Sequence, residues 1–362
     1  MKVFDYSLVK DPQYFCDGRL EAHSDHVYYG ADDNCEEESS FRHSLNGLWK
    51  FQYAVNYTSA LKGFEKEEYN CRDWADIHVP AHIQMEGYDV PQYANVQYPW
   101  EGREDIRLGE IPEHFNPVAS YVKYFSVPER MKGRRLFISF QGAESGLALW
   151  LNGQFIGYSE DSFTPSEFEL TDYVKDGENK LAVQVFKWTA SSWCEDQDFY
   201  RFSGIYRDVY LYTVPEVHVY DMEVRAIPEE DLKNAVLTLK TKNRGKGTAE
   251  VKLSKEGVIV AERTLALDGE NSLTVEIKNP CLWSAEEPEL YDLELKIFDE
   301  AEALQEVIPQ KVGFRRFEMK DGIMTLNGKR IVFKGVNRHD FSSVTGRYVS
   351  EEDYRKDLTV MK

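Results

Sequence analysis

Short segments in which apolar and polar residues alternate, separated by turn signals, dominate the chain from residue 44 onward. In the clearest case two such segments flank Asn152-Gly153, a dipeptide that supplies the positive φ angles of a tight β-hairpin. Aromatic and β-branched residues, which strands favour, are frequent in these segments. The pattern predicts a jelly-roll β-sandwich over residues 43–214, with strands that include 135–140, 147–151, 154–158 and 181–186.

Two regions flank this sandwich. Residues 1–42 show neither helical nor strand periodicity and hold an acidic tract, so we expect an extended arm. After residue 214 aromatic residues become fewer and new alternating segments follow, with polar, glycine-bearing turns at 243–245 and 268–269. About 100 residues of this kind predict an immunoglobulin-like β-sandwich over residues 215–312, with strands at 236–241, 249–253, 258–264, 273–277 and 291–298.

The pattern changes again in residues 313–362. Asn327-Gly328 is a hairpin signal, and residues 331–333 form a continuous apolar run typical of a strand buried on both faces. A polar loop follows, and then Ser350 can cap a helix with an acidic first turn. Strand, loop and helix are the opening unit of an α/β fold. The predicted helix has one apolar face, formed by Tyr354, Leu358 and Met361.

Composition and charge exclude some classes of binding partner. With 43 Lys plus Arg against 63 Asp plus Glu, the net charge of −20 repels phosphate backbones and anionic membrane surfaces. We therefore expect neither nucleic acid nor a membrane as a partner. The N-terminus lacks an apolar signal segment, no run of 18 apolar residues occurs, and five scattered cysteines lack metal-site spacing. These features predict a cytoplasmic protein with reduced thiols.

The sequence has no nucleophile elbow, phosphate-binding loop, HExxH or EF-hand motif. Residues 93–100 are rich in Tyr and Pro, and the alternative to a binding role is a loop packed by its own aromatic residues. Residues 193–201 hold three carboxylates between aromatic residues, which suit sugar hydroxyls or a hard cation but also a solvated acidic turn. Residues 337–340 follow the apolar run, where barrel enzymes carry site residues, although a lone histidine is as often structural.

These segments belong to a larger set of strings: SLNGLW (44–49), QMEGYD (84–89), YANVQYP (93–99), EDQD (195–198), RFSGIYRD (201–208), NPCLWS (279–284), VGFR (312–315) and GVNRH (335–339). The strings occur across nearly the whole chain in the order found in glycoside hydrolase family 2. The chain thus resembles the N-terminal part of the β-galactosidases of that family, of the lac-operon type. The Asn-Val-x-Tyr-Pro and Glu-Asp-Gln-Asp strings separate β-galactosidases from the β-glucuronidases and β-mannosidases of the same fold.

The resemblance implies an architecture and a site. The expected fold is mainly β: a jelly-roll sugar-binding domain, an immunoglobulin-like domain and, in residues 313–362, the first βα unit of a TIM barrel, the (β/α)8 catalytic domain. Asn95 and Asp198 match positions that reach the galactose subsite, and Asp198 also matches a sodium ligand. His339 matches a barrel histidine that contacts the sugar. The pattern departs from the family after His339, where residues 340–343 read Asp-Phe-Ser-Ser.

The implied activity is retaining hydrolysis of terminal non-reducing β-D-galactose residues from β-galactosides such as lactose, by a homo-oligomer. In the family the acid/base Glu, the nucleophilic Glu and the magnesium ligands lie on later barrel strands. A barrel needs about 250 residues, so we expect no catalytic residue within this chain. The alternative is a non-catalytic carbohydrate-binding or assembly module that complements a separate catalytic chain. A lectin-like jelly roll unrelated to hydrolysis is disfavoured because it does not explain the presence of residues 331–362.

Overall fold

The computed structural model describes residues 3–195 and 198–362, and strands dominate it. The fold is mainly β, as predicted. The chain divides into two structural units. The first unit contains the residues up to Glu21, His43–Thr213 and Arg338–Lys362, and the second contains Ala22–Arg42 and Val214–Asn337.

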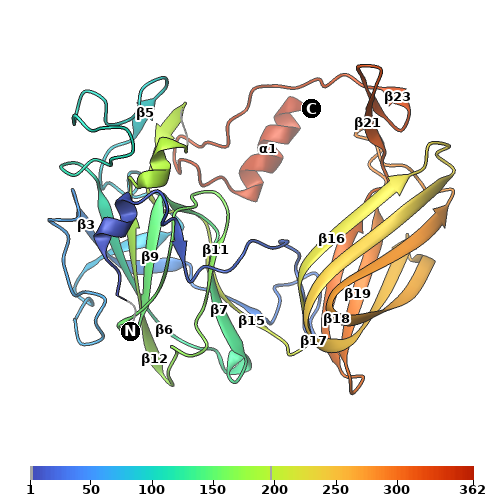
Figure 1. Cartoon of the computed structure of the whole chain (residues 1–362), viewed down its shortest axis with the longest axis horizontal. Coiled ribbons are helices and arrows are strands. Elements are labelled where there is room, and N and C mark those ends of the chain that lie inside the picture. The colour runs from blue at the N-terminus through green and yellow to red at the C-terminus, as the bar shows by residue number, and fades with distance from the viewer. Residues whose placement is uncertain (1–2, 196–197) are drawn as a thin grey trace. The chain divides into compact units, whose positions relative to one another are not determined.

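The first unit is a sandwich of two antiparallel sheets (Figure 1). The predicted hairpin is confirmed, because Asn152 and Gly153 have φ angles of 51° and 80° between paired strands. The seven-stranded sheet has the order β1 (Cys16–Asp17), β10 (Gln154–Ser159), β9 (Gly146–Leu151), β12 (Glu178–Phe186), β6 (Val118–Ser126), β3 (Gly47–Ala54) and β4 (Ala75–Val79). The four-stranded sheet has the order β11 (Ser166–Glu169), β7 (Arg135–Phe140), β15 (Val209–Val214) and β2 (Arg42–Ser44).

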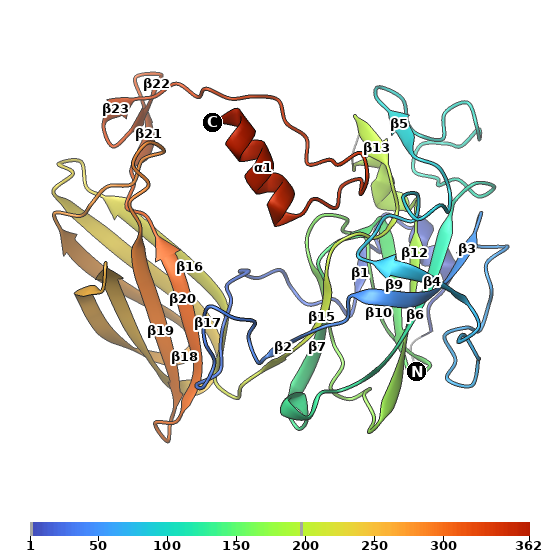
Figure 2. The ribbon, with the colours of Figure 1, turned by 180° about the vertical axis from the view of Figure 1, so that it is seen from behind.

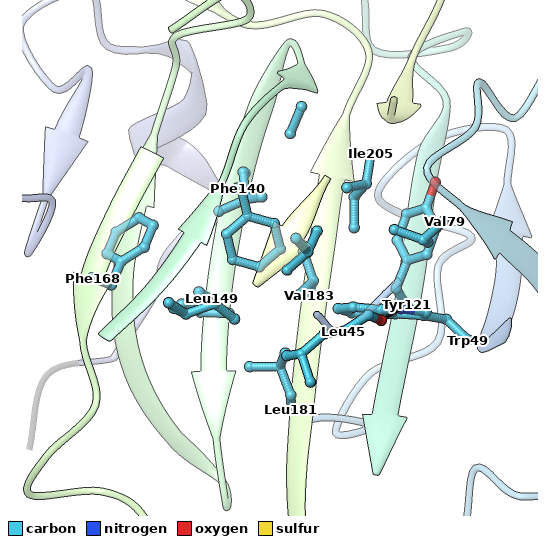
Figure 3. Close-up of a cluster of buried hydrophobic side chains, with 14 of the residues drawn as sticks. Leu45, Trp49, Val79, Tyr121, Phe140, Leu149, Phe168, Leu181, Val183 and Ile205 are labelled. Carbon is cyan, nitrogen blue, oxygen red and sulfur yellow. Dashed lines mark hydrogen bonds between the residues drawn. The ribbon is translucent and has the colours of Figure 1, made fainter. Parts of the chain in front are cut away.

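Apolar side chains from both sheets meet in the core of this sandwich (Figure 3). Leu149 and Val183 come from the larger sheet and Phe140 from the smaller one, and each is fully buried. Burying a side chain of this size stabilises the fold by about 1.5–3 kcal/mol. The period-two alternation of the sequence therefore corresponds to side chains that alternately face the core and the opposite face of each sheet.

The N-terminal residues contribute to both units. In the first unit, β1 is the edge strand of the large sheet, and Phe4 and the 3-10 helix η1 (Tyr6–Lys10) pack on the outer face of that sheet, where the Phe4 ring lies 5.6 Å from the Trp150 ring and Val9 is fully buried. In the second unit, Tyr29 exchanges backbone hydrogen bonds of 2.9 Å with Val307. The segment predicted as an arm thus packs on the sandwiches at several points, while residues 34–38 of its acidic tract are exposed.

The second unit is a β-sandwich of long strands, yellow to orange in Figure 2. The first part of β17 pairs with β16 and its last part pairs with β19, on either side of a register break between Lys242 and Lys246. The turns predicted at 243–245 and 268–269 are therefore wrong: both lie inside continuous strands that bend there. The strands are β16 (His218–Pro228), β17 (Asn234–Lys255), β18 (Val258–Lys278), β19 (Tyr291–Asp299) and β20 (Leu304–Val312).

The predicted hairpin at Asn327-Gly328 is confirmed in a small sheet of β21 (Phe317–Lys320), β22 (Ile323–Leu326) and β23 (Lys329–Arg330). The strand predicted at residues 331–333 is wrong. The Ile331 amide donates to the Met324 carbonyl oxygen of β22 at 3.0 Å, but no strand is formed at 331–333, and the Val332 and Phe333 side chains are 68% and 69% exposed. A strand buried on both faces needs neighbouring strands and covering helices, and the described residues leave Val332 and Phe333 uncovered.

The predicted C-terminal helix is confirmed as α1 (Glu351–Met361). Ser350 caps it, because its side chain accepts from the Asp353 amide while Asp353 accepts from the Ser350 amide. Its expected apolar face is partly to mostly exposed, with Leu358 63% exposed. Together with the loop before it, the helix belongs to the first unit, which includes residues 338–362.

Four short strands and two further 3-10 helices lie at the ends of the first sandwich. They are β5 (Gln92–Ala94) paired with β13 (Phe199–Arg201), β8 (Ala143–Glu144) paired with β14 (Gly204–Ile205), η2 (Glu129–Met131) and η3 (Ala190–Trp193). Two of them, β5 and β13, are directly followed by Asn95 and preceded by Asp198, respectively.

Candidate functional site

The β5–β13 ribbon brings together two of the predicted site residues. Ala94 pairs with Phe199, so Asn95 after β5 and Asp198 before β13 come next to each other across the ribbon. Both side chains are exposed. The Tyr93 hydroxyl donates to Asp198 Oδ1 at 2.6 Å, and this hydrogen bond raises the pKa of Tyr93. The ribbon therefore presents a carboxylate, an amide and a phenol at one edge of the sandwich.

His339 lies at the same edge. Its ring centroid is 5.2 Å from that of Phe199, the residue that follows Asp198. Two residues on, the Phe341 ring stacks on Tyr200 at 5.0 Å with an interplanar angle of 8°. The structure thus gathers all three predicted substrate-binding residues around β13. It also gives Phe341, the point at which the sequence departs from the family pattern, a stacking partner on that strand.

The two described carboxylates of the acidic segment at 193–201 lie in different surroundings. Asp196 lies outside the described residues. Glu195 turns away from the edge and accepts from Ser162 Oγ at 2.8 Å, and burial raises its pKa to about 7. Of the two described carboxylates, Asp198 is therefore the one presented at the exposed edge.

The aromatic segment at 93–100 combines the two alternatives left open by the sequence. Its first half forms β5 and presents Asn95. Its second half is a loop packed by aromatic residues, in which Tyr98 stacks on Trp100 at 5.3 Å and Trp193 lies 4.9 Å from Trp100. This packing holds the loop that leads out of β5.

His82 lies beneath this edge and carried no signal in the sequence. Its ring is stacked between Phe202 at 4.4 Å and Tyr206 at 4.8 Å, and its Nε2 accepts from the Arg347 amide at 3.2 Å. Burial, and then the nearby Arg347 guanidinium, lower the pKa of His82 to about 3. His82 is thus a neutral acceptor at physiological pH.

We expect His82 to make the stability of the first unit depend on pH. An unfolded histidine titrates near pH 6.5, so the contribution of His82 is complete above about pH 6.5 and is lost as the pH falls toward the folded pKa. Wild type and His82→Gln should differ most in unfolding free energy above that pH, and the gap should narrow by roughly 1.4 kcal/mol per pH unit down to about pH 4. Urea unfolding of both proteins at several pH values measures the gap. A difference in unfolding free energy that did not change with pH would contradict the lowered pKa of His82 in the folded protein.

The described residues contain no group of three or more His, Cys, Asp or Glu side chains able to hold a metal ion. A sodium ion carries one charge, which one exposed carboxylate can balance together with neutral oxygen ligands. Residues 3–195 and 198–362 also contain no helix with the length and apolar character that crossing a membrane requires.

Comparison with known proteins agrees with this architecture. Three family models match in sequence: the sugar binding domain of glycosyl hydrolases family 2 at residues 42–215, a second domain of the family at 217–315, and its TIM barrel domain at 317–362. A solved β-glucuronidase from Bifidobacterium dentium, 20% identical, superimposes with a TM-score of 0.71 over 90% of this chain and 56% of that one. That likeness concerns the fold.

Two curated relatives are closer in sequence. A β-galactosidase of Halalkalibacterium halodurans is 52% identical over 98% of this chain, and a β-galactosidase large subunit of Latilactobacillus sakei is 40% identical over 97%. The chain spans only 36% of the length of the first and 59% of the second. The order of the domains, the strings that carry the resemblance and these relatives agree: the chain belongs to glycosyl hydrolase family 2.

Proposed function

We propose that this chain is the N-terminal part of a retaining β-galactosidase and supplies part of its galactose subsite. The whole enzyme removes terminal non-reducing β-D-galactose from β-galactosides such as lactose. The observation that carries the proposal is the β5–β13 pairing, which presents Asn95 and Asp198 at one edge with His339 against Phe199. Neighbouring sugar hydroxyls need donors and acceptors in just such a group, and a carboxylate gives the strongest hydrogen bonds.

In this proposal Asp198 binds both a sugar hydroxyl and a sodium ion, while Asn95 and His339 complete the polar contacts. The two glutamates that perform retaining hydrolysis, with carboxyl groups about 5–5.5 Å apart, and the magnesium ligands come from the rest of the protein. No residue of this chain is assigned a catalytic role. A cytoplasmic location and a homo-oligomeric state remain predictions from the sequence.

Substitution of Asp198 tests the proposal. In the full-length protein we expect Asp198→Ala to lower kcat/KM for a nitrophenyl β-galactoside roughly 10- to 100-fold, because a hydrogen bond to a charged group contributes about 1.5–3 kcal/mol. The response of activity to added sodium should weaken in the same variant. Steady-state kinetics over a sodium titration measure both effects.

Asp76→Asn is a matched control, since Asp76 is a half-exposed carboxylate on β4 paired with Lys50 at 2.9 Å. It should leave both quantities unchanged. Sodium activation that survived in Asp198→Ala while substrate affinity fell would remove the metal role. Wild-type activity in Asp198→Ala would place the sugar site elsewhere.

A second candidate function follows from the relatives named large subunit. We propose as the alternative that the chain is part of a protein that needs a separately encoded partner to hydrolyse galactosides. The exposed apolar residues of α1, with Leu358 63% and Val360 80% exposed, are consistent with a surface that further protein covers. The reading frame after Lys362 and co-purification with a second polypeptide distinguish the two arrangements.

A further inference from the structure

Arg347 has a side chain only 7% exposed and contacts the elements that carry the candidate site. Its Nη2 donates to the carbonyl oxygen of Tyr200 at 3.0 Å, and its Nη1 lies 3.3 Å from Glu144 Oε1. The guanidinium carbon lies 4.6 Å from the centroid of the Phe199 ring. One side chain thus contacts β8 and two consecutive residues of β13.

A tight turn brings Arg347 to this position. Ser342 and Gly346 exchange backbone hydrogen bonds of 2.7 and 2.9 Å. Gly346 has a φ of 71°, and a Cβ added there would lie 2.7 Å from His82 Cδ2, so glycine is needed. The Arg347 amide then donates to His82 Nε2. Both the backbone and the side chain of Arg347 are therefore fixed on the first sandwich.

The same segment carries His339 and Phe341. The Phe341 ring stacks on Tyr200, whose carbonyl oxygen Arg347 holds, and the His339 ring faces Phe199, whose ring the guanidinium covers. Arg347 therefore contacts the same two residues of β13, Phe199 and Tyr200, that the segment with His339 and Phe341 packs against. Movement of Arg347 would change the position of His339 relative to Asp198.

We infer that Arg347 is a positioning residue of the galactose site, which holds β13, next to Asp198, against the segment that carries His339. The inference rests on the proposed function. Arginine suits the role because its planar group donates in several directions and stacks on aromatic rings. A lysine ammonium at this place could neutralise Glu144 but could not also hold the Tyr200 carbonyl and cover Phe199. The Glu144 side chain is 6% exposed, and the guanidinium places a charge of opposite sign beside it.

The difference between arginine and lysine separates a positioning role from a purely structural one. In the full-length protein we expect Arg347→Met to lower the unfolding temperature and Arg347→Lys to recover most of it. In Arg347→Lys, KM for a nitrophenyl β-galactoside should still rise about tenfold or more, with kcat changed much less. Hydrogen exchange of this 362-residue chain should be roughly tenfold faster at the amides of β5 and β13 in Arg347→Lys, with β12 unchanged.

Arg355→Lys is the matched control. Arg355 is 77% exposed on α1 and pairs with Glu351, so its substitution should alter neither KM nor exchange. Wild-type exchange at β13 in Arg347→Lys would overturn the inference, and so would faster exchange with an unchanged KM. If the wild-type enzyme hydrolyses no β-galactoside, the proposed function fails, and hydrogen exchange alone then decides whether Arg347 holds β13.

Discussion

The polypeptide of residues 1–362, purified by itself, is expected to show no measurable turnover of a nitrophenyl β-galactoside. Retaining hydrolysis needs one carboxyl group to protonate the leaving oxygen and a second to form the glycosyl-enzyme, and the family resemblance assigns neither to this chain. The general acid alone contributes roughly 10²- to 10⁴-fold to such a rate, and loss of the nucleophile removes the covalent route altogether. Asn95, Asp198 and His339 can orient a sugar but cannot replace those groups.

The assay needs a host without β-galactosidase of its own. Adding the separately expressed remainder of the full-length protein is the positive control, since it would supply the missing carboxyl groups. Activity that co-purified with residues 1–362 and disappeared on substitution of one of its own carboxylates would show that this chain performs the chemistry. The domain assignment of the catalytic residues would then be wrong.

Substitution of Lys187 by methionine is expected to destabilise the first unit by about 3–5 kcal/mol. Lys187 and Asp89 form an ion pair of 2.6 Å whose side chains are 0% and 2% exposed. Burial lowers the pKa of Lys187, while Asp89 opposes that effect. Asp89 also accepts from Gln84 Nε2 at 2.8 Å. Removing the ammonium leaves a buried carboxylate without its counterion on the loop that leads into β5.

The double variant Lys187→Met with Asp89→Asn is the control. Asparagine retains an acceptor for Gln84 and tolerates the φ of 69° at this position. We expect it to recover more than half of the loss, because no unpaired charge remains. Chemical unfolding, followed by hydrogen exchange in β6 and β12 to isolate the first unit, measures both variants. A cost below about 1 kcal/mol for Lys187→Met would mean that the pair behaves as an exposed one.

The sequence pattern was sufficient where structure depends on local chemistry. Asn152-Gly153 predicted a hairpin because only a turn with positive φ angles joins strands so closely, and Ser350 predicted the start of α1 through its cap. The pattern was insufficient where a segment depends on distant partners. Residues 331–333 have the composition of a buried strand, yet a strand forms only when neighbouring strands accept its backbone hydrogen bonds.

The long strands β17 and β18 show a different limit. Polar, glycine-bearing stretches such as 243–245 read as turns, and the structure uses them to bend continuous strands. Composition alone does not distinguish a bend within a strand from a turn between two strands, because glycine and polar residues allow the backbone conformations that both require. The predicted strands at 236–241 and 249–253 are therefore two parts of β17, those at 258–264 and 273–277 are two parts of β18, and β16 and β20 were not predicted, although the β class was correct.

Some residues of the candidate site could likewise be predicted from the sequence, and others could not. The family resemblance supplied Asn95, Asp198 and His339, and the β5–β13 pairing explains why the first two lie together although 103 positions separate them in the sequence. Arg347, Glu144 and His82 carried no recognisable motif. Their roles arise from burial and from contacts between segments far apart in the sequence, which only the folded chain defines.

The most direct test of the central claim is a structure of the full-length protein with galactose bound. We expect the sugar hydroxyls to lie within hydrogen-bond distance of Asp198, Asn95 and His339 at the edge formed by β5 and β13, with Arg347 still bonded to the Tyr200 carbonyl. Galactose bound elsewhere, with Asn95, Asp198 and His339 still exposed to solvent, would contradict the claim that this chain supplies part of the galactose subsite.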